Sequence, residues 1–155
     1  MTLVYESALA PSSGSPNLRD VVEEKPQLEI TVVFTSFEAT VQALKEAGLL
    51  AGQLEATITL LVPQVVPWPL QLTCPPVLVD FNEARFRVIA SRTGVPTNVR
   101  IYFCRDRFET VLRVVPHGSI VMVGIRKRFW PTADRRLAWA LRRRGHQVIL
   151  TEMED

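Results

Sequence analysis

The stretch SIVMVGIRKRFWPTADRRLAWALRRRGHQVILTE, residues 119–152, decides the fold of this chain. It begins with an apolar run, residues 119–125, which leads into a short basic and aromatic loop. A basic helix is expected at residues 132–146, and a second apolar run follows at residues 147–153. Parallel strands need a long connection, usually a helix, so this pattern is typical of a strand–helix–strand unit. The stretch therefore predicts an α/β protein.

The same alternation of strand and helix extends back to residue 28. The earlier runs are rich in β-branched residues and apolar on both faces, which suits strands that are covered on both sides. Strands are expected at residues 28–35, 55–63 and 98–105, and helices at residues 36–53, 81–94 and 106–118. A β-α-β-α-β-α-β-α-β order predicts a three-layer α/β/α sandwich with a Rossmann-like sheet of five parallel strands.

The chain is expected to hold one folded domain, residues 28–155, behind a flexible N-terminal tail, residues 1–27. The tail is rich in Pro, Ser and Gly and has little periodicity, although Leu3, Val4 and Tyr5 form a short apolar anchor. Inside the domain, residues 64–79 are an irregular, Pro-rich crossover. At 155 residues the chain is long enough to bury a substantial core.

Composition narrows the possible classes of protein. With 47% hydrophobic and 22% charged residues, the chain has the balance of a soluble globular protein. Its two cysteines, Cys74 and Cys104, form no CxxC motif, so neither a disulfide framework nor a zinc site is expected. The start of the chain lacks the pattern of a secretory signal, and no run approaches the roughly 20 apolar residues of a membrane helix. We expect a cytoplasmic protein without membrane insertion.

Three stretches together resemble the universal stress protein family, within the larger group of adenine-nucleotide α-hydrolase-like folds. They are ITVVFTSFEATVQALKEAGLLAGQLEATITLLVP at residues 30–63, RDRFETVLRVVPHGSIVMVGIRKR at residues 105–128, and TADRRLAWALRRRGHQVILTE at residues 132–152. With its spacing, the resemblance covers residues 28–153. It implies the strand order 3-2-1-4-5 and a ligand crevice at the carboxyl ends of strands 1 and 4. It also implies a homodimer formed through the last strand.

Nucleotide-binding members of that family have a G-x2-G-x9-G-[S/T] motif after the fourth strand. Glycines there let the backbone approach a phosphate, and N–H groups at the helix start bind the anion. Laid on this chain, the motif falls on Gly124, Lys127, Leu137 and Ala138, so three of its four positions differ. The acidic residue that usually ends the first strand falls on Thr35. ATP binding in the family manner is therefore not expected.

The loop RKRFW can still serve the crevice in another way. Three cations beside two aromatic rings can bind an anion or stack on a base, whereas Phe129 and Trp130 can equally pack to close a vacated crevice. No cofactor is expected, and an adenine nucleotide is the alternative. The candidate ligand-binding residues are Thr35, Ser36, Gly124, Arg126, Lys127 and Arg128.

The arginines of the last helix, the two histidines and Cys104 can each be explained without a ligand or a reaction. The arginines Arg142, Arg143 and Arg144 in the last turn of the final helix complement the helix dipole and its free carbonyls, so a nucleic-acid partner is not expected. Neither His117 nor His146 has an evident nucleophile beside it, and no acidic cluster indicates a metal. Cys104 is either a buried, inert thiol or a thiol that a neighbouring arginine activates.

Three functions therefore remain open for the chain. The leading hypothesis is a non-catalytic regulatory or stress-response domain that acts as a dimer or through a protein partner. The alternative is a binder of a nucleotide or other anion in the crevice between strands 1 and 4. The last is an enzyme of the same fold group, a nucleotide hydrolase, which would need a phosphate loop that the sequence lacks.

Overall fold

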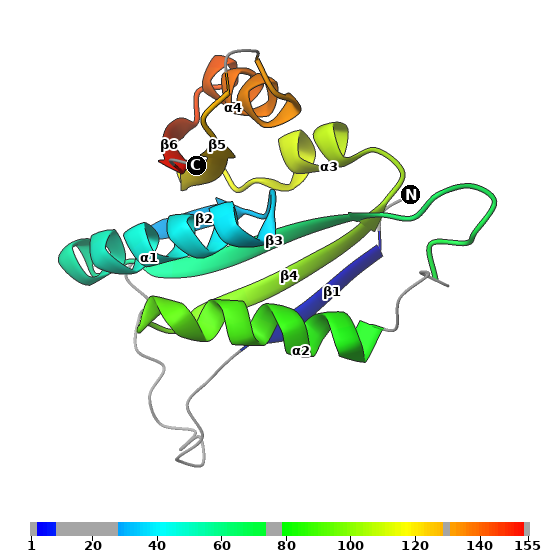
Figure 1. Cartoon of the computed structure of the whole chain (residues 1–155), viewed down its shortest axis with the longest axis horizontal. Coiled ribbons are helices and arrows are strands. Elements are labelled where there is room, and N and C mark those ends of the chain that lie inside the picture. The colour runs from blue at the N-terminus through cyan, green and yellow to red at the C-terminus, as the bar shows by residue number, and fades with distance from the viewer. Residues whose placement is uncertain (1–2, 9–27, 74–78, 129–130, 154–155) are drawn as a thin grey trace.

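A computed structural model of the chain describes residues 3–8, 28–73, 79–128 and 131–153 (Figure 1). Its single sheet has six strands in the order β1-β4-β3-β2-β5-β6. The strands are β1 (Leu3–Ala8), β2 (Glu29–Val33), β3 (Thr57–Val65), β4 (Thr97–Cys104), β5 (Ile120–Arg126) and β6 (Gln147–Met153). The helices are α1 (Phe37–Leu54), α2 (Val79–Ala90), α3 (Arg107–Val114) and α4 (Ala133–Arg143), with a short 3-10 helix η1 (Ser91–Thr93).

The five strands from β2 to β6 are parallel to their neighbours, which confirms the predicted order 3-2-1-4-5. β2 is the central strand, and its last residue Val33 lies opposite Leu61 of β3 and Val123 of β5. The chain winds outward from β2 to β3 and β4, and then returns to β5 and β6 on the other side. The order of strands thus reverses between β2 and β5, where open α/β sheets bind their ligands.

β1 is an addition that the sequence did not predict. Residues 3–8, expected in the flexible tail, pair antiparallel with β4, from Leu3 opposite Phe103 to Ala8 opposite Asn98. An edge strand such as β4 presents unpaired N–H and C=O groups, and a further strand satisfies them. The rest of the expected tail, residues 9–27, lies outside the described residues, as do residues 74–78 of the Pro-rich crossover.

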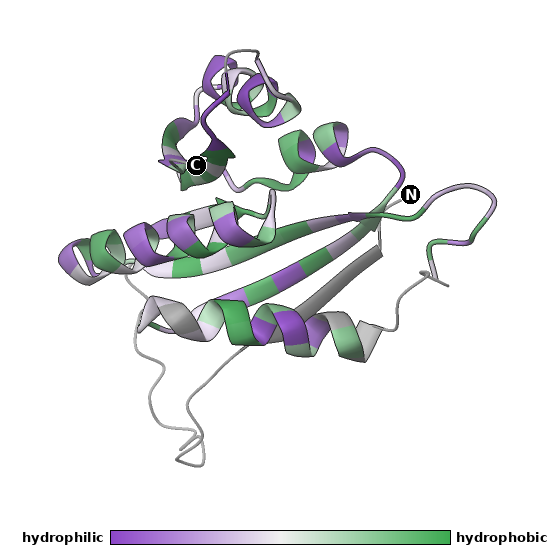
Figure 2. Cartoon of the chain, viewed as in Figure 1, coloured by the Kyte–Doolittle hydropathy of each residue, from purple (hydrophilic) through white to green (hydrophobic). Residues whose placement is uncertain are grey.

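Two apolar cores cover the two faces of the sheet, as the sandwich prediction requires. Helices α1 and α2 bury Leu44 and Ile89 on one face against Leu60 of β3, among other residues. On the other face, α3 and α4 bury Val111 and Leu137. Figure 2 shows the consequence, since the central strands are largely hydrophobic whereas the helices alternate between hydrophobic and hydrophilic bands. Within the described residues, no helix is both long and apolar enough to cross a bilayer.

Side-chain caps begin three of the helices where the sequence predicted them. Ser36, Asp106 and Thr132 each accept a hydrogen bond from the backbone N–H three residues further on. Such caps satisfy N–H groups that the first helical turn leaves without partners. They place the first turns of α1, α3 and α4 at the carboxyl edge of the sheet, directly after strands β2, β4 and β5.

Candidate functional site

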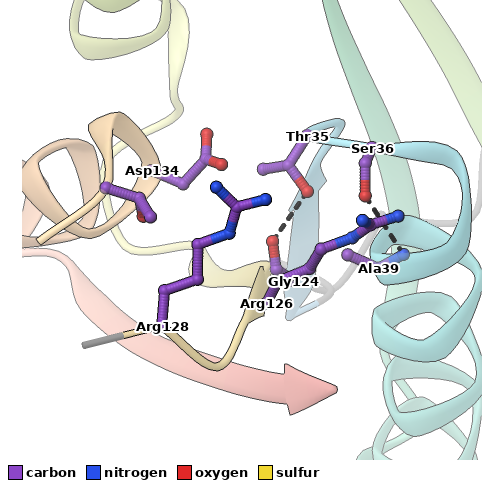
Figure 3. Close-up of a pocket in the computed structure, with 8 residues that line it drawn as sticks. Thr35, Ser36, Ala39, Gly124, Arg126, Arg128 and Asp134 are labelled. Carbon is purple, nitrogen blue, oxygen red and sulfur yellow. Dashed lines mark hydrogen bonds between the residues drawn. The ribbon is translucent and has the colours of Figure 1, made fainter. Parts of the chain in front are cut away.

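A crevice of about 320 Å³ lies at the carboxyl ends of β2 and β5, at the predicted switch point. Its size is at the lower end of the range for small-molecule sites. Figure 3 shows its side chains arriving from the β2–α1 turn, from the end of β5 and from the first turn of α4. The lining residues are Thr35, Ser36, Ala39, Gly124, Arg126, Arg128, Thr132 and Asp134.

Five of the six predicted ligand-binding residues line this crevice, and the sixth does not. Lys127 is exposed but is not among the lining residues, and its backbone N–H donates to the carbonyl oxygen of Met153, 3.3 Å away. Successive residues of an extended chain point to opposite sides, so Arg126 and Arg128 can share a side that Lys127 cannot. Lys127 therefore does not line the crevice in this structure, and its role in ligand binding stays a prediction.

Two polar lining residues, Thr132 and Asp134, were missed by the sequence analysis. Both belong to the start of α4, where Thr132 is the N-cap and Asp134 lies in the first turn. A signal was present in the sequence, because the helix that follows β5 must begin at the same edge of the sheet at which β5 ends. In Figure 3 the guanidinium of Arg128 points into the space between Asp134 and Thr35.

Gly124 serves helix packing in this structure. A Cβ atom on Gly124 would lie 2.2 Å from the carbonyl oxygen of Ala39 in the first turn of α1, closer than any real contact. The hydroxyl of Thr35 also donates a 2.7 Å hydrogen bond to the carbonyl oxygen of Gly124. The glycine thus lets α1 approach β5 closely, which is one of the ordinary reasons for a glycine inside a strand.

Acidic side chains already engage the cations around the crevice. Arg126 forms a 2.7 Å ion pair with Glu38 of α1, and that hydrogen bond holds the pKa of the Glu38 carboxyl below its usual value. Arg107 of α3 pairs with Asp134 at 2.8 Å and also donates to the carbonyl oxygen of Phe34 at 3.0 Å. These bonds fix the positions of the three helix starts around the crevice, and they reduce its net positive charge.

The residues at the glycine positions of a phosphate loop have other surroundings in this structure. Leu137, at the third glycine position, is buried in the core between α4 and the sheet, and Ala138 beside it is buried as well. Lys127 places a long side chain at the second glycine position. At these positions the chain has side chains where a phosphate loop has glycines that let its backbone approach the anion.

The two histidines lie away from the crevice, and Cys104 is buried. His117 and His146 stack with ring centroids 5.8 Å apart, at the opposite end of the sheet, before β5 and β6 begin. Burial lowers the pKa of His146, as do the neighbouring His117 and Arg144. Cys104 is buried, and burial raises the pKa of its thiol, whereas a reactive cysteine has a lowered pKa. The described residues contain no cluster of side chains suited to a metal ion.

Among known proteins, a likeness to this chain is found in solved structures. No protein-family model matches the sequence, and no curated protein matches it significantly. The chain is similar to a solved structure of a protein from the universal stress protein family of Burkholderia pseudomallei, with 22% sequence identity and a TM-score of 0.48. The match covers 79% of this chain and 94% of the other. A likeness at this level carries no information about ligand or partner, so both are inferred below from this chain's own residues.

Proposed function

We propose that this protein is a non-catalytic regulatory domain of the universal-stress-protein type, which acts as a dimer or by binding a protein partner and does not bind ATP in the family manner. The proposal rests on the surroundings of two positions of the glycine motif, Gly124 and Leu137. Gly124 is in contact with the backbone of α1, and Leu137 is part of the core. The position that serves phosphate in nucleotide-binding members therefore serves packing in this chain.

The absence of catalysis is supported by the distribution of reactive groups. Both histidines of the chain lie at the opposite end of the sheet from the crevice. The hydroxyl of Ser36 caps α1, and that of Thr35 donates to Gly124. A nucleophile needs a base within hydrogen-bond distance, and among the described residues neither hydroxyl has a histidine beside it.

The dimer is supported by the free edge of β6. This strand ends the described sheet, its inner side pairs with β5, and no described strand covers its outer side. An open edge with half-buried Ile149 and Leu150 is suited to pairing with a second copy across a two-fold axis. We expect a homodimer in which β6 continues the sheet into the partner.

Light scattering at several protein concentrations, combined with hydrogen exchange, tests the dimer. In a monomer, the β6 amides that point away from β5 exchange quickly with solvent. In a β6-paired dimer, the same amides become protected as the concentration rises, whereas the amides of β3 do not change. A monomer at all concentrations contradicts the dimer, and a dimer without added protection of β6 contradicts this interface.

The alternative function is the binding of a small anion in the crevice, and the two lining arginines favour it. Arg126 and Arg128 bring guanidinium groups to a hollow that also contains the hydroxyls of Thr35 and Ser36. Guanidinium groups are well suited to carboxylate and phosphate ligands. Because Glu38 and Asp134 balance part of this charge, a small anion such as inorganic phosphate or AMP is favoured over a triphosphate.

Calorimetric titration with phosphate, AMP and ATP distinguishes the two functions. If the crevice binds anions, the Arg128→Gln variant loses the heat of binding, and Glu38→Gln binds a few-fold more tightly because Arg126 is released. Lys127→Gln is the matched control, since it removes the same charge from the same loop without altering the crevice lining. No saturable heat with any of the three ligands leaves the regulatory function as the better account.

A further inference from the structure

The outer face of α4 carries a tryptophan that the fold does not use. The helix buries Leu137, Ala138 and Leu141 against the sheet, and the ring of Trp139 lies on the side away from them. Trp139 is 67% exposed, although a tryptophan usually covers much of its surface in a folded protein. Figure 1 shows α4 at the periphery of the molecule, above β5 and β6, where a partner can reach it.

A hollow of about 370 Å³ lies beside this ring. Among the described residues it is lined by Pro131, Arg135, Arg136 and Trp139, which bring an aromatic ring, a proline and two arginine side chains to it. Such a hollow can accept an apolar side chain, while the guanidinium groups stay at its rim. Single exposed apolar residues are common, but an exposed tryptophan beside a hollow resembles the anchor sites of protein interfaces.

The arginines of α4 divide into those with structural partners and those without. Arg142 donates to the carbonyl oxygen of Val148 at 3.2 Å, and Arg144 donates to that of Leu112 at 3.0 Å. Their structural role was predicted, although the carbonyls belong to β6 and α3 and not to the last turn of α4. Arg135 pairs with Glu152 at 2.8 Å.

Two guanidinium groups on this face remain available. Among the described residues, no acidic side chain lies within ion-pair distance of Arg136 or Arg143. The guanidinium of Arg143 lies 5.9 Å from the centre of the Trp139 ring, an interaction that leaves its charge uncompensated. The two arginines are seven residues apart, about 10 Å along the helix axis, and they flank Trp139 on the outer face.

From this arrangement we propose that the outer face of α4 binds an acidic peptide segment of a partner protein, which inserts an apolar side chain beside Trp139 and places carboxylates against Arg136 and Arg143. This inference rests on the proposed partner-binding function and names the surface and the partner's chemistry. Charge complementarity selects an acidic partner, because a second copy would bring the same two cations to this face.

Nucleic acid fits this face less well than an acidic peptide. Proteins that bind nucleic acid through the backbone typically neutralise about 6–10 phosphates, and most of their affinity comes from those contacts. Three of the five arginines of this helix region are engaged by Glu152 or by carbonyl groups, which leaves two. Two cations beside one ring and an apolar hollow are sufficient for a short peptide.

A selection from a random peptide library displayed on phage tests the proposal with the full-length protein. We expect the enriched peptides to carry Asp or Glu on both sides of a Leu, Phe or Trp. In fluorescence anisotropy, their dissociation constants rise at least ten-fold for Trp139→Ala and for Arg136→Glu or Arg143→Glu. Lys45→Glu is the matched control, because it makes the same charge change on exposed α1 and leaves binding unchanged.

The results that would contradict the proposal can be told apart from one another. Enriched peptides that bind Trp139→Ala as tightly as the native protein would place the partner site elsewhere and leave the partner-binding function intact. No enrichment would remove peptide binding by this face altogether. A labelled oligothymidylate that binds through Trp139, or a dimer that Trp139→Ala dissociates in light scattering, would assign the face to nucleic acid or to a second copy. Circular dichroism of the variants checks that each one is folded.

Discussion

Replacing Gly124 by alanine is the sharpest test of how the crevice is built. The new Cβ would lie 2.2 Å from the carbonyl oxygen of Ala39 and 2.6 Å from its carbonyl carbon. Ordinary contacts begin near 3.4 Å, so the first turn of α1 must move away from β5 by roughly 1 Å. The nearest blocking atoms belong to the backbone of the buried residue Ala39, and no side-chain rotation can relieve the contact.

The expected cost follows from the size of that displacement. Over-packing a buried site destabilises a protein by about 1–3 kcal/mol, and a backbone contact belongs at the upper end of that range. For a chain of this length, about 1 kcal/mol lowers the melting temperature by roughly 2–4 °C. Gly124→Ala should therefore lower the melting temperature by about 4–12 °C. The corresponding cost of about 2–3 kcal/mol is a substantial part of a typical stability of roughly 5–15 kcal/mol.

Thermal and urea unfolding followed by far-UV circular dichroism measure this cost. Gly52→Ala provides the matched control, since its Cβ meets nothing within 4 Å and alanine stabilises a helix interior by about 0.5–1 kcal/mol. Gly48→Ala should be destabilised like Gly124→Ala, because its Cβ would lie 2.3 Å from the carbonyl oxygen of Thr93. If Gly124→Ala has the same melting temperature as the native protein, α1 does not pack against β5 this closely, and the packing explanation of Gly124 is wrong.

Three further predictions concern buried polar groups. Thr40→Val should lower the free energy of unfolding by about 1–3 kcal/mol, because the N–H of Thr35 loses its acceptor, the Thr40 Oγ1 at 3.1 Å. An unchanged midpoint in urea unfolding would contradict this role of Thr40. His146 has a lowered pKa in the fold, chiefly through burial and then through His117, so the unfolded chain binds the extra proton first. Stability should therefore fall as the pH drops below the ordinary histidine value of 6.5, and this slope should be absent in a His146→Asn variant if the assignment is correct. In a variant with Cys104 as its single cysteine, a thiol reagent at neutral pH should react only after unfolding, and fast reaction of the native protein would show an activated thiol.

Much of the fold could be predicted because its signals are local in the sequence. Apolar runs and helical periodicity identified strands β2 to β6 and the four helices. The expected starts of three helices fall on the residues that cap them, Ser36, Asp106 and Thr132. Right-handed crossovers then restrict how such units assemble, so the parallel sheet follows from the order of elements. The strand order 3-2-1-4-5 came from the family resemblance.

The composition of the crevice could be predicted only in part. The strand ends that line it follow from the topology, so Thr35, Ser36 and Gly124 were expected and are present. Which residues of the basic loop turn inward depends on the path of the chain after β5, and this path separates Lys127 from Arg126 and Arg128. No local signal in the loop specifies that path.

The sequence by itself determined that the chain alternates strand and helix, where three of the helices begin, and that the glycine motif is incomplete. The tertiary structure decided what the remaining groups do. It placed the backbone of Ala39 against Gly124, paired β1 with β4, and left Arg136 and Arg143 of α4 without acidic partners among the described residues. The physical reason is the distance along the chain over which each interaction acts. Caps and periodicity depend on residues a few positions apart, whereas packing contacts and ion pairs join residues that are distant in the chain.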